Sequence, residues 1–172
     1  MNSNPRLLSV FIFLFVISSC STTPTKMYVS DVENYSSINE SVNVNVIGGK
    51  QGRLDASSYQ AALVDALVKS GLVESIGNST VDLNVQILSL NEPMFGGDFT
   101  VTIRSLWILK SNDCKEALRK QITSEYTAKL SDNLLGVARL NMASEGAVRQ
   151  NIKDGLEYIS TEGATWKQQK CS

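Results

Sequence analysis

The side chains that could perform chemistry in this chain are few. The sequence contains three cysteines (Cys20, Cys114 and Cys171) and no histidine. Without histidine, the Ser-His and Cys-His pairs that commonly activate nucleophiles are impossible, and so is a zinc site with histidine ligands. Three cysteines are also too few for a four-cysteine zinc site. We therefore expect no metal and no cofactor.

Two other patterns could act on a substrate. The segment 47–52, Ile-Gly-Gly-Lys-Gln-Gly, lies where a phosphate-binding loop would lie, but its lysine precedes Gln51 instead of Ser or Thr and its glycine spacing is wrong. Asp98 and Asp132 flank turns that we expect at one end of the sheet, and glycosidases use two such carboxylates. Turns also favour Asp for local hydrogen bonds. Catalysis by this carboxylate pair is thus an alternative interpretation of the sequence.

The N-terminus has the features of an export signal that ends at a lipidated cysteine. Arg6 provides a positive charge, and residues 7–17 are apolar apart from Ser9. This run is too short to span a hydrocarbon core of about 30 Å but has the length of a signal-peptide core. The sequence 17–20, Ile-Ser-Ser-Cys, resembles the bacterial lipobox. That resemblance implies cleavage after residue 19 and attachment of lipid to Cys20.

The residue that follows Cys20 favours an outer-membrane location. In Gram-negative lipoproteins an Asp at this position usually causes retention in the inner membrane, and here it is Ser21. We expect residues 20–40, which are polar and lack periodicity, to form the lipidated cysteine and a flexible tether. The prediction is then a signal peptide at 1–19, this tether, and one periplasmic domain at 41–172 on the periplasmic face of the outer membrane.

Charge excludes some classes of partner. The chain carries 16 Lys and Arg against 17 Asp and Glu, without a basic block. Nucleic-acid binding depends on clustered basic side chains, so we expect no nucleic-acid partner. The expected partners are the membrane, through the lipid at Cys20, and an envelope protein or lipid.

Hydrophobic periodicity predicts four strands and two helices in the order β-α-β-β-β-α. The predicted strands cover 42–46, 81–90, 99–110 and 118–130, and the predicted helices cover 57–70 and 133–160. Ser57 and Gln60 have the spacing of a capping box for the first helix. Three glycines interrupt the second helix, and we expect them to allow close approach to the sheet: Gly136, Gly146 and Gly155.

These elements predict an α+β fold with two layers. Neither helix is stable alone, so both must bury their apolar stripes on one face of the sheet. The last three strands form an antiparallel meander with one wet face, and the first two strands are candidates for a parallel pair around the first helix. The expected architecture is a two-layer sandwich with two helices on one face of a four-stranded, mainly antiparallel sheet.

Cys114 and Cys171 are candidates for a disulfide. Strand 118–130 and helix 133–160 are each about 40 Å long, so an antiparallel return would bring the end of the chain back to the hairpin that holds Cys114. The oxidising periplasm favours such a bond. Lys115 could alternatively lower the pKa of Cys114 and make it a reactive thiol.

An apolar pair at a turn is the most informative loop feature. Met94 and Phe95 lie between Pro93 and Gly96, where polar residues are usual. Leu134 and Leu135 follow another turn that we expect at the same end of the molecule. The four side chains either fold back onto the end of the sheet or form an exposed tip that meets a partner or lipid.

Several stretches resemble a group of small proteobacterial outer-membrane lipoproteins. The resemblance covers about residues 57–159, and the segments that carry it are 62–67, 70–72, 90–94, 99–102, 126–128, 131–132, 137–140 and 145–152. Some members of the group are labelled sugar-nucleotide acyltransferases, but such enzymes use hexapeptide repeats and a catalytic histidine, which this chain lacks. The resemblance supplies no functional residues. The element order is more loosely similar to that of other periplasmic lipoproteins, including the plug-like partner of the lipopolysaccharide translocon.

The sequence therefore predicts a membrane-anchored, non-enzymatic binding or assembly module of the bacterial cell envelope. The alternative is a cell-envelope hydrolase or transferase that uses carboxylates. A deep pocket with two converging carboxylates would favour the alternative, whereas an apolar patch near Pro93 would favour the binding module.

Overall fold

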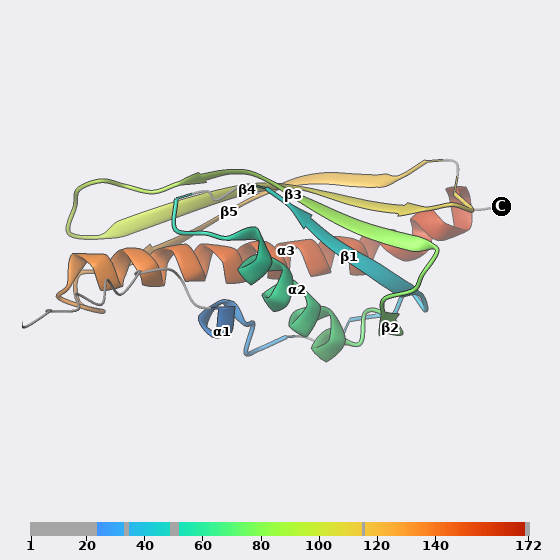
Figure 1. The fold of residues 1–172 in the computed structure, drawn as a ribbon, viewed down its shortest axis with the longest axis horizontal. Coiled ribbons are helices and arrows are strands. Elements are labelled where there is room, and N and C mark those ends of the chain that lie inside the picture. Colours follow the sequence, from blue (N-terminus) through green and yellow to red (C-terminus); the bar gives the residue numbers. More distant parts are fainter. Residues whose placement is uncertain (1–23, 33–34, 49–51, 115, 171–172) are drawn as a thin grey trace, which may run out of the picture.

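The computed structural model describes residues 24–32, 35–48, 52–114 and 116–170. The elements, in chain order, are α1 Pro24–Met27, β1 Ser41–Ile47, α2 Ala56–Ser70, β2 Ser75–Ile76, β3 Val81–Asn91, β4 Phe99–Ser111, β5 Leu118–Ala128 and α3 Gly136–Lys170. The strands form one layer, and α2 and α3 lie together on one face of it (Figure 1). The predicted α+β class is confirmed.

The sheet has five strands in the order β2-β1-β3-β4-β5, so the predicted four-stranded sheet was wrong by one strand. The missed strand β2 has two residues, which is too short to show a period. The parallel pair of β1 and β3 and the antiparallel meander of β3, β4 and β5 both form. The sheet is therefore mixed, with two parallel pairings at the β2 side.

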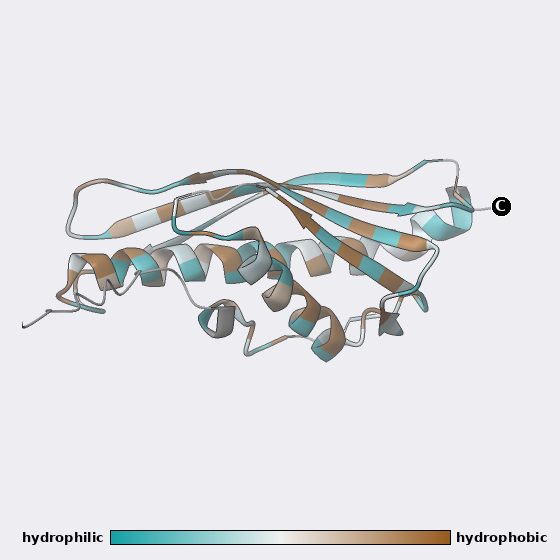
Figure 2. Cartoon of the chain, in the orientation of Figure 1, coloured by the Kyte–Doolittle hydropathy of each residue, from teal (hydrophilic) through white to brown (hydrophobic). Residues whose placement is uncertain are grey.

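Alternation along the strands separates a covered face from an uncovered one. In β4, for example, Val101, Ile103 and Trp107 are buried under the helices, whereas Arg104 and Lys110 on the other face are exposed. The change of hydropathy from residue to residue along the strands is visible in Figure 2. The uncovered face is the wet face that the sequence predicts.

Helix α2 has its N-cap two residues before the predicted capping residue Ser57. Its N-cap is Asp55, and the Ser57 hydroxyl donates a hydrogen bond to the Asp55 carboxylate. Gln60 instead bonds to the backbone of β1, where its amide donates to the Val44 carbonyl and its carbonyl accepts from the Val46 amide. Gln60 was predicted to cap the helix, but its side chain instead ties α2 to the sheet.

Helix α3 continues to Lys170, ten residues beyond its predicted end near residue 160. Gly163 and Trp166 extend its buried stripe, but the residues around them are polar apart from Ala164, and this hides the period. With 35 residues, α3 is about 52 Å long. It packs along β4 and β5, whereas α2 packs on β1.

Two glycines allow α3 to lie unusually close to the sheet. A Cβ atom at Gly146 would lie 2.3 Å from the Tyr126 ring, and one at Gly155 would lie 2.2 Å from the Trp107 ring. The prediction of close approach is confirmed at these two positions. At Gly136, the first residue of α3, a Cβ would make an ordinary contact 3.7 Å from Phe99.

A buried polar cluster joins the two helices to the sheet. Asn151 of α3 accepts hydrogen bonds at Oδ1 from the hydroxyls of Tyr59 and Ser105, each at 2.7 Å, and its amide donates to Ser124. Asn151, Tyr59 and Ser105 have no solvent exposure. Burial raises the pKa of the Tyr59 hydroxyl well above its usual range, which keeps it protonated as a donor. The cluster fixes α3 laterally, because apolar contacts alone have no direction.

The packed domain begins before residue 41, so part of the segment predicted as a tether belongs to the core. Met27, Val29 and Ile38 are buried. Helix α1 contacts both α2 and α3, and the amide of Ile38 donates to the Leu72 carbonyl. The error has a simple cause, because isolated apolar residues in a polar stretch show no period. Residues 1–23, with Cys20 and Ser21, lie outside the described residues.

The close approach of α3 predicts a strong effect of one added methyl group. We expect Gly155→Ala to lower the free energy of unfolding by about 1 to 3 kcal/mol, because the new Cβ overlaps the buried Trp107 ring. Gly136→Ala in the same helix is the matched control and should be neutral or slightly stabilising. Denaturant unfolding measures both, and equal stability of the two variants would contradict this packing.

Candidate binding surface at one end of the sheet

Two loops meet at one end of the molecule. The β3–β4 loop covers 92–98 and the β5–α3 loop covers 129–135. Phe99 and Ala128, which flank these loops, are paired across β4 and β5. Both loops lie at the left end of the view in Figure 1. The structure thus brings the four residues of the predicted tip to the same end, as the sequence indicated.

All four of these apolar side chains are exposed. The exposed fractions are 85% for Met94, 87% for Phe95, 86% for Leu134 and 71% for Leu135, and Val137 at the start of α3 is 53% exposed. These five residues are called the apolar end below. The alternative in which the side chains fold back onto the sheet does not occur. Val137, in the first turn of α3, adds a fifth exposed apolar side chain to this end.

Polar side chains hold the two loops in place. The Asp98 carboxylate accepts a hydrogen bond from the Leu130 amide at 2.8 Å, which links one loop to the other. Within the second loop, Asp132 accepts from the Lys129 amide and Asn133 accepts from the Leu135 amide, each at 2.8 Å. The loops therefore present their apolar side chains from a hydrogen-bonded frame.

A buried arginine and phenylalanine support the apolar end from below. The Arg139 guanidinium lies over the Phe99 ring, 5.1 Å from its centroid, and donates to the Asn133 carbonyl at 2.6 Å. Arg139 is 5% exposed and Phe99 is 8% exposed. An open hollow of about 440 Å³ lies beside them, lined by Leu135, Gly136, Val137, Ala138 and Asn141. This end is an apolar surface with a shallow depression, not a deep pocket.

Asp98 and Asp132, the candidate catalytic carboxylates, stabilise the loops. Asp98 and Asp132 are exposed, and each accepts a backbone hydrogen bond, which is the local role that turns favour. Neither lines the hollow at the apolar end. In the described part of the chain, no group of three or more Cys, Asp or Glu side chains is placed to hold a metal ion.

A carboxylate lies beside the described edge of the glycine-rich loop. Residues 49–51 lie outside the described residues. At the edge of the loop, a Cβ on Gly52 would lie 2.6 Å from a carboxylate oxygen of Glu92. Glu92 is also held by the Ser144 hydroxyl at 2.9 Å. A fixed carboxylate at this position would repel a phosphate group.

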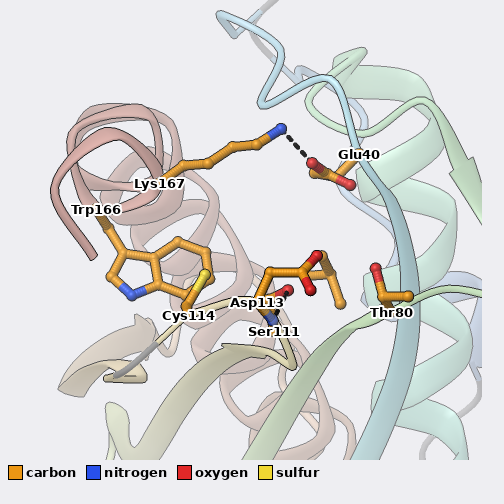
Figure 3. A pocket seen from close by; sticks show the side chains of 8 residues that line it. Glu40, Thr80, Ser111, Asp113, Cys114, Trp166 and Lys167 are labelled. Atoms are coloured by element: carbon orange, nitrogen blue, oxygen red, sulfur yellow. Dashed lines mark hydrogen bonds and ion pairs between the residues drawn. The ribbon is translucent and has the colours of Figure 1, made fainter. Parts of the chain in front are cut away.

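The opposite end of the molecule holds Cys114 (Figure 3). Cys114 is disulfide-bonded, and Cys171 lies outside the described residues. Trp166 of α3 donates from Nε1 to the Glu116 carbonyl at 2.6 Å, so the end of α3 lies against the β4–β5 hairpin. A small pocket of about 50 Å³ lies at this end, and Glu40 and Lys167, which line it, form an ion pair. This is the antiparallel return that the sequence predicts, and the pairing with Cys171 stays a prediction.

Sequence reasoning missed the residues that position the apolar end. Arg139 reads as an ordinary surface residue of a helix, and its burial depends on Phe99, which is 40 positions away in the sequence. Asn151 lies three residues after the apolar Val148, on the same face of the helix. That spacing could have marked it as an inward-facing polar residue, but not its partners.

Comparison with known proteins identifies the fold. No protein-family model and no curated protein matches the sequence. A DUF330 protein from Xanthomonas campestris superposes with a TM-score of 0.60 at 14% identity, over 78% of this chain and 91% of that one. An uncharacterised protein gives 0.53 at 13% identity, over 76% and 100%. Rare lipoprotein B from Shewanella oneidensis gives 0.48 at 9% identity, over 73% and 97%.

These identities show a shared fold and nothing about function, and the last score is too low to carry an argument. The chain therefore has the α+β fold of the first two structures. Membership of a lipoprotein family stays a prediction. Among the described residues, no helix combines the length and apolar character needed to cross a bilayer.

The exposure of the apolar end predicts that it contributes little to folding. The double variant Met94→Ser with Phe95→Ser should change the free energy of unfolding by less than about 0.5 kcal/mol, as is usual for exposed positions. Phe99→Ala, in the adjacent strand, should cost about 3 to 5 kcal/mol because this ring is buried. Thermal or denaturant unfolding compares them. A large loss of stability in the double variant would show that these side chains pack against the rest of the domain.

The position of α3 predicts the partner of Cys114. Non-reduced peptide mapping of the purified protein should yield a peptide in which Cys114 is joined to Cys171. Reduction should separate the two halves. A peptide in which Cys114 is joined to Cys20, or a peptide with a free thiol at Cys171, would contradict the predicted pairing.

Proposed function

We propose that this protein is a non-enzymatic binding module of the bacterial cell envelope. It is anchored to the periplasmic face of the outer membrane by lipid at Cys20, and it docks a partner protein through its apolar end. The observation that carries the proposal is the exposure of five large apolar side chains at one end, four on loops held by hydrogen bonds and one at the start of α3.

The lipid anchor is supported by the sequence around Cys20. A signal-peptide core ends at a cysteine that follows Ile17 and two serines. Lipidation at such a site adds several acyl chains, and two or more chains hold a protein firmly at a membrane. Ser21, in place of Asp, supports the outer membrane as the destination.

The apolar end has the character of a protein-binding surface. Contiguous exposed apolar patches are uncommon on soluble domains and mark interaction sites. Large apolar anchors such as Phe and Met, set in a polar surround, are typical of the centre of a protein interface. The hydrogen-bonded frame reduces the conformational entropy that binding must otherwise cost.

The surround of the apolar end favours a protein over a lipid surface. Asp98 and Asp132 are exposed at this end, and Lys129 is the exposed base beside them. Carboxylates next to the apolar side chains would lie against lipid headgroups that are themselves negatively charged, which costs free energy. A protein partner with basic groups around an apolar depression matches the surface better.

Site-specific photo-crosslinking in cells tests this function. A photo-reactive phenylalanine analogue in place of Phe95 should form a discrete adduct with one envelope protein. The same analogue in place of Gln121, which is exposed on β5, is the matched control and should form none. The adduct at position 95 should decrease severalfold when Leu134 and Leu135 are both changed to Ser. Failure to form a protein adduct, or adducts with phospholipid instead, would contradict a protein partner.

A further inference from the structure

The structure fixes where the chain leaves the packed domain on its way to Cys20. Helix α1 contacts α2 and α3, with Met27 fully buried. The guanidinium of Arg149, on α3, donates to the Lys26 carbonyl. The Lys69 ammonium, at the end of α2, lies 5.6 Å from the centroid of the Tyr28 ring. The start of the domain is therefore attached to both helices.

Helix α1 lies on the outer side of the helical layer. Figure 1 shows α3 between the sheet and α1, with α1 beside α2. A helix with its side chains is about 10 Å thick, and neighbouring helices pack about 8 to 10 Å apart. The uncovered face of the sheet is thus about 20 Å away from α1, through the molecule.

The length of chain between α1 and Cys20 is short. Helix α1 begins at Pro24, four residues after Cys20. An extended chain spans at most about 3.6 Å per residue, so four residues span at most about 14 Å. This is less than the thickness of the domain. A lipid at Cys20 cannot pass around the helices to place the uncovered face of the sheet on a membrane.

The surface around α1 has the chemistry of a membrane-facing side. Lys26 is exposed, and Arg149 is partly exposed beside it. The nearby pairs Asp65–Lys69 and Asp31–Lys153 add no net charge. Basic side chains next to a lipid anchor strengthen its attachment to anionic lipids.

From this geometry we infer that the α1 side of the helical layer lies against the lipid bilayer, and that the polar uncovered face of the sheet points into the periplasm. The inference rests on the proposed lipidation of Cys20. It also places the apolar end sideways along the membrane surface, because α3 lies along the sheet. A partner protein docked there would sit beside this domain at the same membrane.

Quenching of an introduced tryptophan by brominated phospholipids tests this orientation. Full-length protein carrying its native anchor is purified from membranes and inserted into vesicles of anionic and zwitterionic lipids with brominated acyl chains. Lys26→Trp reports from α1, and Thr123→Trp is the matched exposed position on the uncovered face of β5. The signal of the parent protein, from the buried Trp107 and Trp166, is subtracted.

We expect fractional quenching at position 26 to be at least twice that at position 123. Equal quenching at the two positions, or stronger quenching at 123, would overturn the orientation while leaving the anchor intact. Flotation of the vesicles is measured in the same samples. Protein that does not float with them lacks the anchor, which would overturn both the proposed lipidation and the orientation that rests on it.

Discussion

The contact between α3 and the sheet is the constraint on which the rest of the structure depends. Gly146 and Gly155 leave room for the rings of Tyr126 and Trp107, so the helix backbone lies almost directly on β4 and β5. Asn151, between the two glycines, then satisfies the buried hydroxyls around it. The glycines set the distance between α3 and the sheet, and the asparagine sets the position of α3 along its own axis. A shift of one turn would place a side chain where only a glycine fits and leave buried polar groups unpaired.

This contact determines what each end of α3 can do. The helix is long enough to extend past the core at its start, where Val137 joins the exposed loops. Its other end reaches the hairpin with Cys114, through the bond from Trp166 to Glu116. Helix α1 in turn packs against the outer side of the same helix, at Arg149. The apolar end, the end that holds Cys114 and the start of the packed domain are therefore held in a fixed relation by one element.

Sequence periodicity predicted the elements whose apolar and polar residues alternate over several turns or strand positions. The long strands, both main helices and the common location of Met94 and Leu134 follow from such patterns. The two-residue β2, the buried Met27 and the last ten residues of α3 did not, because each offers too few apolar residues to define a period. The Asn151 cluster and the burial of Arg139 were also missed. Their partners come from distant strands, and only the assembled fold brings them together.

The intact mass of the protein extracted from membranes tests the proposed lipid anchor at Cys20. We expect a chain that begins at Cys20 and carries the added mass of a diacylglyceryl group and an acyl group. Cys20→Ser should abolish both the cleavage before residue 20 and the added mass. A wild-type chain whose Cys20 is unmodified, or whose N-terminus lies elsewhere, would contradict the account.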